Sequence, residues 1–98
     1  MTLRVVFRRA ARDELIEAAA WYGRQGPGLG EEFVREIEQS IQAAATSPQR
    51  HPVVFGDIRR TVARRFPFAV YFRVRSDALV VLAVFHGRRN PLIWQRRT

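Results

Sequence analysis

The stretch that decides the fold is Phe68-Ala-Val-Tyr-Phe-Arg-Val-Arg75, then Ser76-Asp77, then Ala78-Leu-Val-Val-Leu-Ala-Val-Phe-His86. Its first part alternates with a period of two, which is typical of a strand with one buried face. The buried face of that strand would carry Phe68, Val70, Phe72 and Val74. Ser76-Asp77 has turn chemistry, and the second part is apolar on both faces, as in a central strand that is covered on both sides. The stretch therefore predicts a β-hairpin at the centre of a sheet.

Two helical patterns precede this hairpin. From Ala10 to about Gly23, apolar residues recur at a spacing of three or four, which predicts an amphipathic helix. A second helix follows, with Glu31 and Glu32 in its first turn, and Ser47-Pro48 ends it. Between them, residues 23–30 hold four Gly and one Pro and are interpreted as a connection. A phosphate cradle is disfavoured there, because no strand precedes the segment and no Lys follows it.

Three further segments have strand character: Thr2–Phe7, Pro52–Phe55 and Ile58–Arg65. The resulting order, β-α-α-β-β-β, predicts an α+β fold in which a helical hairpin packs on one face of a twisted, mostly antiparallel sheet. At 98 residues the chain suits one domain, residues 1–98, with one core. We expect contacts between two sets of residues: Leu15, Tyr22, Phe33, Ile37 and Ile41 from the helices, and Phe68, Val70, Phe72, Leu82 and Val84 from the sheet.

Composition excludes several classes of site. The chain has no cysteine, so disulfides and thiolate metal sites are excluded. Its two histidines lie far apart in sequence without acids at ligand spacing, and we expect neither a metal nor a cofactor. No apolar run approaches the roughly 20 residues of a membrane span, and the N-terminus lacks a signal-peptide pattern, so we expect a cytoplasmic protein with no membrane partner.

Positive charge is concentrated in the second half. Residues 1–47 hold six Arg and seven acids, whereas residues 48–98 hold eleven Arg and two acids, which gives net charges of −1 and +9. All 17 basic residues are Arg. Because many of them fall in or beside predicted strands, folding would fix them in place, which suits recognition of phosphates or carboxylates. A basic surface that only meets solvent is the alternative reading.

Three residues outside this pattern are candidates for chemistry or binding. His86 ends the most buried strand, where it could act as an acid or base on a phosphodiester or simply bond to the adjoining turn. Trp21 ends the first helix, and Trp94 lies in an Arg-rich tail. Either tryptophan could anchor another protein, although Trp94 could equally cover the sheet edge. No catalytic triad or carboxylate pair can be assembled.

The order of motifs resembles the RelE/ParE toxin superfamily of bacterial type II toxin-antitoxin modules, and it is most similar to the ParE-like, plasmid-stabilisation branch. The resemblance runs nearly end to end. The motifs that carry it are Phe7 with Ala10, Ala11 and Asp13-Glu-Leu15; Trp21-Tyr22; Gly28-Leu-Gly30 with Phe33; Ser47-Pro48; Ile58-Arg59-Arg60; Arg65-Phe-Pro-Phe68 with Val70-Tyr71-Phe72; and Val81-Leu-Ala-Val-Phe-His86 with Arg88-Arg89-Asn90-Pro91 and Trp94.

The resemblance implies a toxin that is neutralised by a cognate, ParD-like antitoxin with an acidic, flexible C-terminal segment. ParE-like members inhibit DNA gyrase without being enzymes, whereas RelE-like members cut mRNA on the ribosome. The missing lysines disfavour the nuclease reading without excluding it, and a non-toxic partner in autoregulation is a further alternative. For target binding we expect Arg88, Arg89, Trp94, Arg96 and Arg97; for antitoxin binding, Trp21, Arg60 and Arg64; and for a nuclease, Arg59, Arg65, Tyr71, Arg73 and His86.

Overall fold

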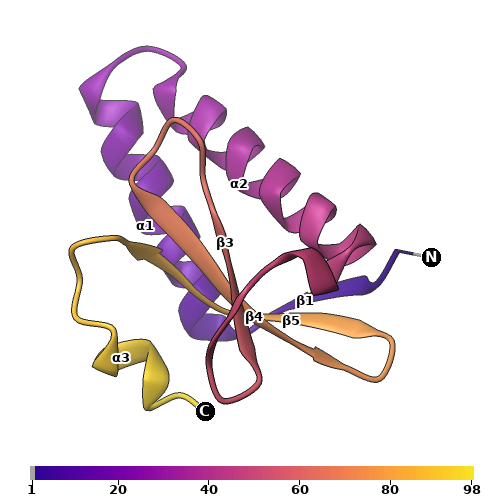
Figure 1. Ribbon diagram of the computed structural model, residues 1–98. Helices are drawn as coiled ribbons and strands as arrows, with labels where there is room; N and C mark the ends of the chain where they lie inside the picture. The colour runs from indigo at the N-terminus through magenta and orange to yellow at the C-terminus, as the bar shows by residue number, and fades with distance from the viewer. Residues whose placement is uncertain (1) are drawn as a thin grey trace.

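A computed structural model describes residues 2–98 of the protein (Figure 1). It contains a helical hairpin, a sheet and a short C-terminal helix. The elements are β1 (Arg4–Phe7), α1 (Arg9–Gln25), α2 (Leu29–Thr46), a 3-10 turn (Pro48–Arg50), β2 (Val53–Phe55), β3 (Ile58–Val62), β4 (Phe68–Arg75), β5 (Ala78–His86) and α3 (Leu92–Gln95). The α+β class and the order of the elements are as the sequence predicts, with α3 added at the end.

The sheet has five strands in the order β1-β5-β4-β3-β2. β1 pairs with β5 in parallel, and every other pairing is antiparallel. The doubly apolar β5 lies inside the sheet, between β1 and β4, as its sequence indicates. β1 is short, however, and pairs only with Ala78–Val81, so the second half of β5 has no strand partner on that side.

The connection between the helices is shorter than the glycine pattern predicts. The structure places Gly23 within α1 and Gly30 within α2, which leaves only residues 26–28 between them. Gly28 has φ 74°, a left-handed conformation that glycine adopts without steric cost, and this residue lets the chain reverse. The predicted loop over residues 23–30 is therefore wrong at both ends, because both helices continue through their outer glycines, Gly23 and Gly30.

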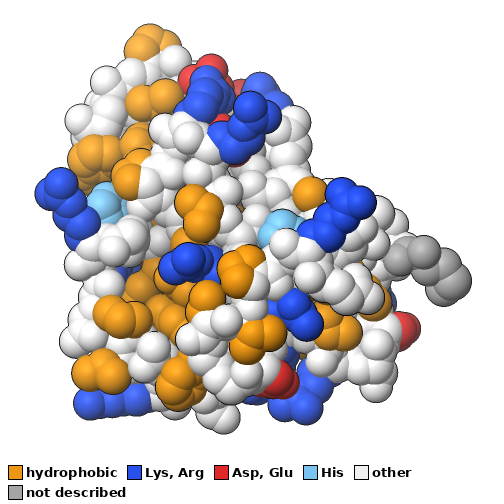
Figure 2. All heavy atoms as spheres, in the orientation of Figure 1, with side chains coloured by type: hydrophobic (Ala, Val, Ile, Leu, Met, Phe, Trp, Pro, Cys, Tyr) orange, Lys and Arg blue, Asp and Glu red, His pale blue; other side chains and the backbone are white. Residues whose placement is uncertain are grey.

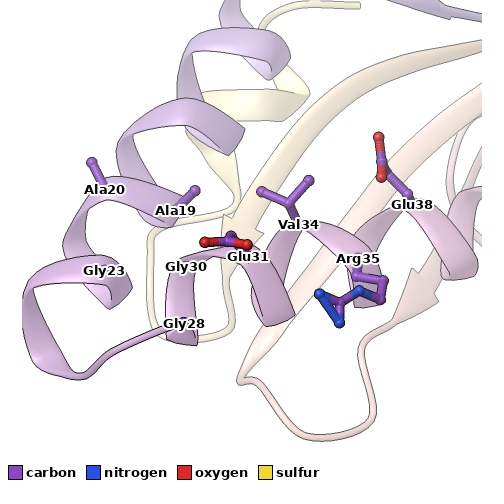
Figure 3. A pocket seen from close by; sticks show the side chains of 9 residues that line it. All are labelled: Ala19, Ala20, Gly23, Gly28, Gly30, Glu31, Val34, Arg35 and Glu38. Atoms are coloured by element: carbon purple, nitrogen blue, oxygen red, sulfur yellow. The ribbon is translucent and has the colours of Figure 1, made fainter.

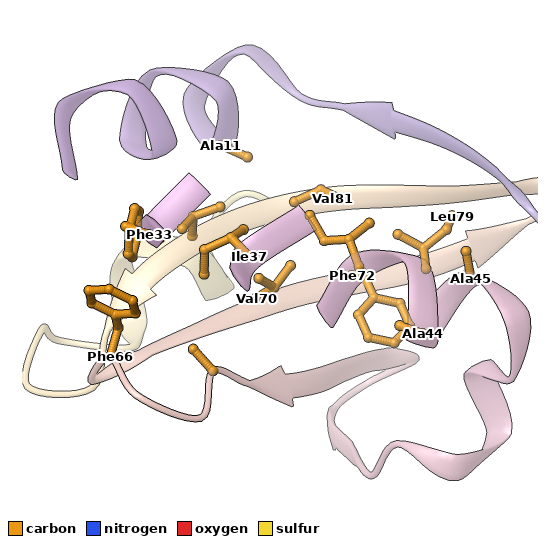
Figure 4. Close-up of a cluster of buried hydrophobic side chains, with 13 residues drawn as sticks. Ala11, Phe33, Ile37, Ala44, Ala45, Phe66, Val70, Phe72, Leu79 and Val81 are labelled. Carbon is orange, nitrogen blue, oxygen red and sulfur yellow. The ribbon is translucent and has the colours of Figure 1, made fainter. Parts of the chain in front are cut away.

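The larger core lies between the helical hairpin and the sheet (Figure 4). Phe33 and Ile37 of α2 are fully buried and pack with Val70 and Phe72 of β4. Aromatic rings cluster at one end, where Tyr22 lies 4.8 Å from Phe66 between ring centroids. This arrangement confirms the predicted contact between the helical stripe and one face of β4.

Leu82 is an exception to the predicted core. Tyr71 of β4 lies opposite Ala83, and the next residue, Phe72, lies opposite Val81, so Leu82 is an extra residue that forms a β-bulge. The bulge shifts the alternation of β5 by one residue. As a result, Val84 faces the helices as predicted, together with Val81, whereas Leu82 faces the other side, contrary to the sequence prediction.

A second, smaller core covers that other side of the sheet. It contains Ile58, Leu82 and Phe85, and Trp94 of α3 closes it with only 2% of its surface exposed. The Trp94 ring stacks on Tyr71 with 4.1 Å between centroids. The C-terminal segment thus folds back across the sheet opposite the hairpin (Figure 1), and Trp94 belongs to the core.

Candidate functional site

A groove runs between α1 and α2 on the outer side of the hairpin (Figure 3). It encloses about 640 Å³. Small residues line it, namely Ala19, Ala20, Gly23, Gly28 and Gly30, together with Val34, Glu31, Arg35 and Glu38 of α2. Such a lining lets another backbone approach closely, which suits a helix from a partner protein.

Gly30 brings the two helices together beneath this groove. A Cβ atom at that position would lie 2.5 Å from the carbonyl oxygen of Ala19 and 3.3 Å from the backbone nitrogen of Gly23. Any larger residue at position 30 would therefore push α2 away from α1. The close crossing of α1 and α2, and with it the shape of the groove, therefore requires a glycine at position 30.

Trp21 stands beside a second hollow at the end of α1. Half of Trp21 is exposed, and with Tyr22, Pro67, Phe68 and His86 it lines a space of about 350 Å³. Nδ1 of His86 accepts a hydrogen bond of 3.0 Å from the backbone N–H of Arg88, so this histidine bonds the adjoining turn. An exposed aromatic next to an apolar hollow can anchor another protein.

The opposite face of the sheet carries a third hollow, of about 290 Å³, between β3, β4 and the C-terminal segment. Arg60, Tyr71, His86, Arg89 and Trp94 contribute to its walls. Arginine side chains lie among apolar ones on the face of the molecule seen in Figure 2. The guanidinium of Arg89 also lies over the ring of Phe85, 4.1 Å from its centroid.

A largely buried carboxylate holds the C-terminal segment in place. Glu14 of α1 pairs with Arg97, with 3.1 Å between Oε1 and Nη1 and 2.7 Å between Oε2 and Nη2. Oε1 also accepts from the backbone N–H of Val84, and Nη1 of Arg97 donates to the carbonyl of Leu82. These side chains therefore supply hydrogen-bond partners to backbone groups of β5 along the edge that β1 leaves uncovered.

Glu36 fastens α2 to the β3–β4 loop in a similar way. Its Oε2 accepts from the backbone N–H groups of Arg64 and Arg65 at 2.6 and 2.8 Å, and its Oε1 accepts from Nε of Arg65 at 3.1 Å. Burial acts to raise the pKa of Glu36, but these hydrogen bonds outweigh it and hold the pKa below its ordinary value. Because the backbone N–H groups of Arg64 and Arg65 bond Glu36, these residues belong to the loop. β3 therefore ends at Val62 and not at Arg65 as the sequence predicts.

The five candidate nuclease residues do not converge. Tyr71 and His86 line the third hollow. Arg59 donates to the carbonyl of His51 at 2.7 Å, and Arg65 bonds Glu36. Arg73 bonds Asp57 with 2.7 Å between Nη2 and Oδ1, and this hydrogen bond lowers the pKa of Asp57.

The residues expected to bind partners are also dispersed. Arg88, Arg89 and Arg96 are exposed, whereas Trp94 is buried and Arg97 is largely engaged with Glu14. Among the antitoxin candidates, Trp21 and Arg64 lie near the helical side of the sheet, where they line the second hollow and a space beside α2. Arg60 lies on the other face of the sheet, where it is opposite Tyr71 in the register of β3 and β4.

Glu14 and Glu36, which hold the C-terminal segment and the β3–β4 loop, are not among the site residues that the sequence predicts. A signal for each was present. Glu36 follows Phe33 by three positions and precedes Ile37, so it lies on the buried stripe of its helix; Glu14 stands at the same distance from the buried Ala11. An acid in a buried stripe predicts a buried partner, because an unpaired buried carboxylate is costly.

Neither a metal nor a membrane site is found in the described part of the chain. Residues 2–98 contain no group of three or more His, Cys, Asp or Glu side chains that could hold a metal ion. No helix within these residues is both long enough and apolar enough to span a bilayer.

Comparisons with known proteins agree on one family. The sequence model described as "ParE toxin of type II toxin-antitoxin system, parDE" matches residues 5–91. Toxin ParE2 of two Mycobacterium tuberculosis strains, CDC 1551 / Oshkosh and H37Rv, is 30% identical over 95 residues, which cover 93% of this chain and 88% of the relative.

Two solved structures share the fold. One is from the chromosomal ParDE toxin-antitoxin system of P. aeruginosa; it has a TM-score of 0.75 and 19% identity, and the match covers 87% of this chain and 96% of that one. The other is from the toxin-antitoxin complex RelBE2 of Mycobacterium tuberculosis, with a TM-score of 0.58, 20% identity and coverage of 88% and 99%.

Proposed function

Because this chain belongs to the ParE toxin family of type II toxin-antitoxin systems, we propose that it inhibits DNA gyrase in the cytoplasm and that a cognate antitoxin neutralises it. On this proposal residues 1–98 act as a single toxin domain and bind rather than cleave. The target, DNA gyrase, is proposed because the sequence is most similar to the ParE-like branch.

The observation that carries the proposal is the engagement of three candidate nuclease arginines in structural bonds. Arg59, Arg65 and Arg73 each bond a backbone carbonyl or a carboxylate away from the hollow that holds Tyr71 and His86. Phosphodiester cleavage requires positive charge at the reacting phosphate, because charge develops there in the transition state. Because Arg59, Arg65 and Arg73 are held elsewhere, these three arginines cannot supply it.

The proposed contact with gyrase lies on the C-terminal segment. Arg88, Arg89 and Arg96 are exposed there, and fixed arginines suit acidic surfaces of a partner. Trp94 and Arg97 serve the same surface indirectly, since they hold the segment against the sheet. This division of roles revises the sequence expectation that all five residues contact the target.

The proposed antitoxin contact lies on the hairpin. The structural neighbours come from toxin-antitoxin systems, and the groove between α1 and α2 has the small-residue lining that a partner helix needs. Trp21, half exposed at the end of α1, would anchor the neighbouring part of the antitoxin. Arg64 lies beside α2 and could meet acids of the same segment.

Purified toxin tests the target directly. Added to gyrase in a supercoiling assay, it should inhibit the reaction, and antitoxin should restore it. Added to ribosomes carrying mRNA, it should leave the message intact. Cleaved message together with unaffected supercoiling would overturn the gyrase proposal.

One observation favours the nuclease alternative. Tyr71 and His86 line the same hollow as Arg60 and Arg89, so an acid-base group and two cations lie close together. On this alternative, substituting His86 would abolish toxicity. A gyrase inhibitor and a nuclease should both arrest growth when their expression is induced. A non-toxic partner that acts only in autoregulation should not.

A further inference from the structure

An apolar patch lies on the face of the sheet opposite the hairpin, around the second core. Two short segments form it: β2 contributes Val54 and Phe55, and α3 contributes Leu92 and Ile93. Their exposed fractions are 37% and 42% in β2 and 49% and 41% in α3. The two segments meet at Trp94, whose ring centroid lies 6.0 Å from that of Phe55. Val54 also lines the same hollow as this tryptophan, so the patch is continuous.

The β2 part of this apolar patch offers side chains and not a backbone edge. β2 is the last strand in the order of the described sheet, and its three residues, Val53–Phe55, are all apolar and exposed. However, β2 is short, Pro52 precedes it, and its register with β3 is irregular. These features keep an edge strand from pairing with another chain. An exposed apolar area that is not a pairing edge indicates docking through side chains.

Arginines border the apolar patch. Arg60 lines the same hollow as Val54, and Arg96 follows Leu92 by one helical turn, where its backbone N–H donates to the Leu92 carbonyl. Both arginines are exposed, and neither forms an ion pair within residues 2–98. An apolar centre with a polar, arginine-bearing rim is the usual anatomy of a protein interface. It fits a partner surface that is apolar in the middle and acidic around it.

We infer that this apolar patch is the centre of the contact with gyrase, an inference that rests on the proposed function. The patch is continuous with the proposed gyrase contact, because α3 presents Leu92 and Ile93 directly before Arg96. The proposed antitoxin contact is on the hairpin, at the other face of the sheet. A second copy of this chain is a poor occupant, since its own arginines would meet those of the first. The arginines thus speed the encounter with gyrase, and the apolar side chains hold the complex.

Two isoleucines provide a matched test. Ile93 lies in the apolar patch, whereas Ile16 lies on α1 with 60% of its surface exposed. In a supercoiling assay with purified gyrase, relaxed plasmid and the full chain, Ile93→Ser should raise the concentration for half inhibition by about tenfold. Ile16→Ser should change this concentration by less than about twofold. Leu92→Ser is a second variant of the patch and should act like Ile93→Ser. The melting temperature of each variant shows whether it is folded.

The dependence of binding on sodium chloride separates the apolar contact from the charged one. Salt screens the attraction between exposed charges but leaves apolar contacts in place. Surface plasmon resonance on immobilised gyrase measures the affinity at low and at high salt. The loss of affinity caused by Ile93→Ser should be the same at both salt concentrations and should lie in the dissociation rate. The loss caused by Arg96→Glu should be smaller at high salt and should lie mainly in the association rate.

If the parent inhibits gyrase and the folded Ile93→Ser and Leu92→Ser variants inhibit it equally well, this inference is overturned and the proposed function stands. If the parent leaves gyrase active, both are overturned. Variants that inhibit gyrase fully but bind the antitoxin less tightly would assign the apolar patch to the antitoxin instead. A parent dimer in light scattering that Ile93→Ser dissociates, with unchanged inhibition, would assign the patch to a second copy of the chain.

Discussion

Glu14 and Arg97 lie 83 positions apart in the chain and are joined by two side-chain contacts, of 3.1 and 2.7 Å. Through this pair α1 holds the last residues of the chain against β5. The same two side chains bond the backbone of Leu82, the residue that forms the β-bulge, and of Val84, two positions further along β5. Thus α1, which packs on the opposite face of the sheet, sets the position of the C-terminal segment.

Glu14→Gln should destabilise the protein by about 1.5 to 3 kcal/mol, because the substitution removes charge-assisted hydrogen bonds from a largely buried site. Glu17→Gln on the same helix is the control, since Glu17 is exposed and forms no ion pair among the described residues. Denaturant midpoints measure both. Hydrogen exchange should also become faster at the Val84 amide in the first variant. Equal midpoints for the two variants would contradict the assigned role of Glu14.

Two glycine substitutions should act in opposite directions. Gly30→Ala places a methyl group against the Ala19 carbonyl and should destabilise the protein by about 1 to 3 kcal/mol. Gly23→Ala meets nothing within 4 Å and should stabilise α1 by up to about 1 kcal/mol. The melting temperatures of the two variants, compared with that of the parent, test both expectations. A stable Gly30→Ala variant would mean that α1 and α2 do not cross closely at this residue.

Glu36 should make the protein sensitive to acid. Its pKa is lowered in the folded state, so its contribution is complete above the unfolded pKa of about 4.3 and is lost as the pH falls through the lower folded value. Glu36→Gln should therefore be less stable at pH 7 and lose less stability between about pH 5 and 3 than the parent does. Glu38→Gln, an exposed neighbour, should follow the parent. Parallel curves for the parent and Glu36→Gln would exclude this linkage.

The two tryptophans should separate stability from binding. Trp94→Ala opens the second core and should cost about 3 to 5 kcal/mol. Trp21→Ala should leave the melting temperature nearly unchanged and raise the rate of dissociation from the antitoxin about tenfold or more. Calorimetry and surface plasmon resonance measure the two effects. The assignment fails if Trp21→Ala binds antitoxin as the parent does.

The strands and helices could be predicted because their periodicities are strong. The alternation of β4 predicts the buried positions of Val70 and Phe72, although Val74 at the far end of the strand is exposed. β5 is apolar enough to require an interior place. Alternation alone could not reveal the bulge at Leu82, because β5 is apolar on both faces and a shift of one residue leaves its pattern unchanged. The pattern misled at Gly30 because the close crossing of α1 and α2 requires a glycine inside α2, and at Gly23 because α1 continues through a glycine that no neighbour requires.

The site was less predictable, since its residues come from distant parts of the chain. The split in charge correctly indicated a basic C-terminal half, but it could not tell which arginines are free. Arg97 and Arg73 differ from Arg88 and Arg96 only in having an acid within reach, and those acids, Glu14 and Asp57, are far away in sequence. The role of Trp94 depends on the folding back of the tail.

The central claim, inhibition of gyrase by positioned charge, is tested most directly by one supercoiling assay on three purified proteins: the parent, His86→Ala, and the double variant Arg88→Glu, Arg96→Glu. Deleting residues 88–98 would be a poorer test, because it removes Trp94 from the core. The account predicts that the parent and His86→Ala inhibit equally and that the folded double variant inhibits at least about tenfold less. Full inhibition by the double variant, or cleavage of ribosome-bound mRNA by the parent that His86→Ala abolishes, would contradict it.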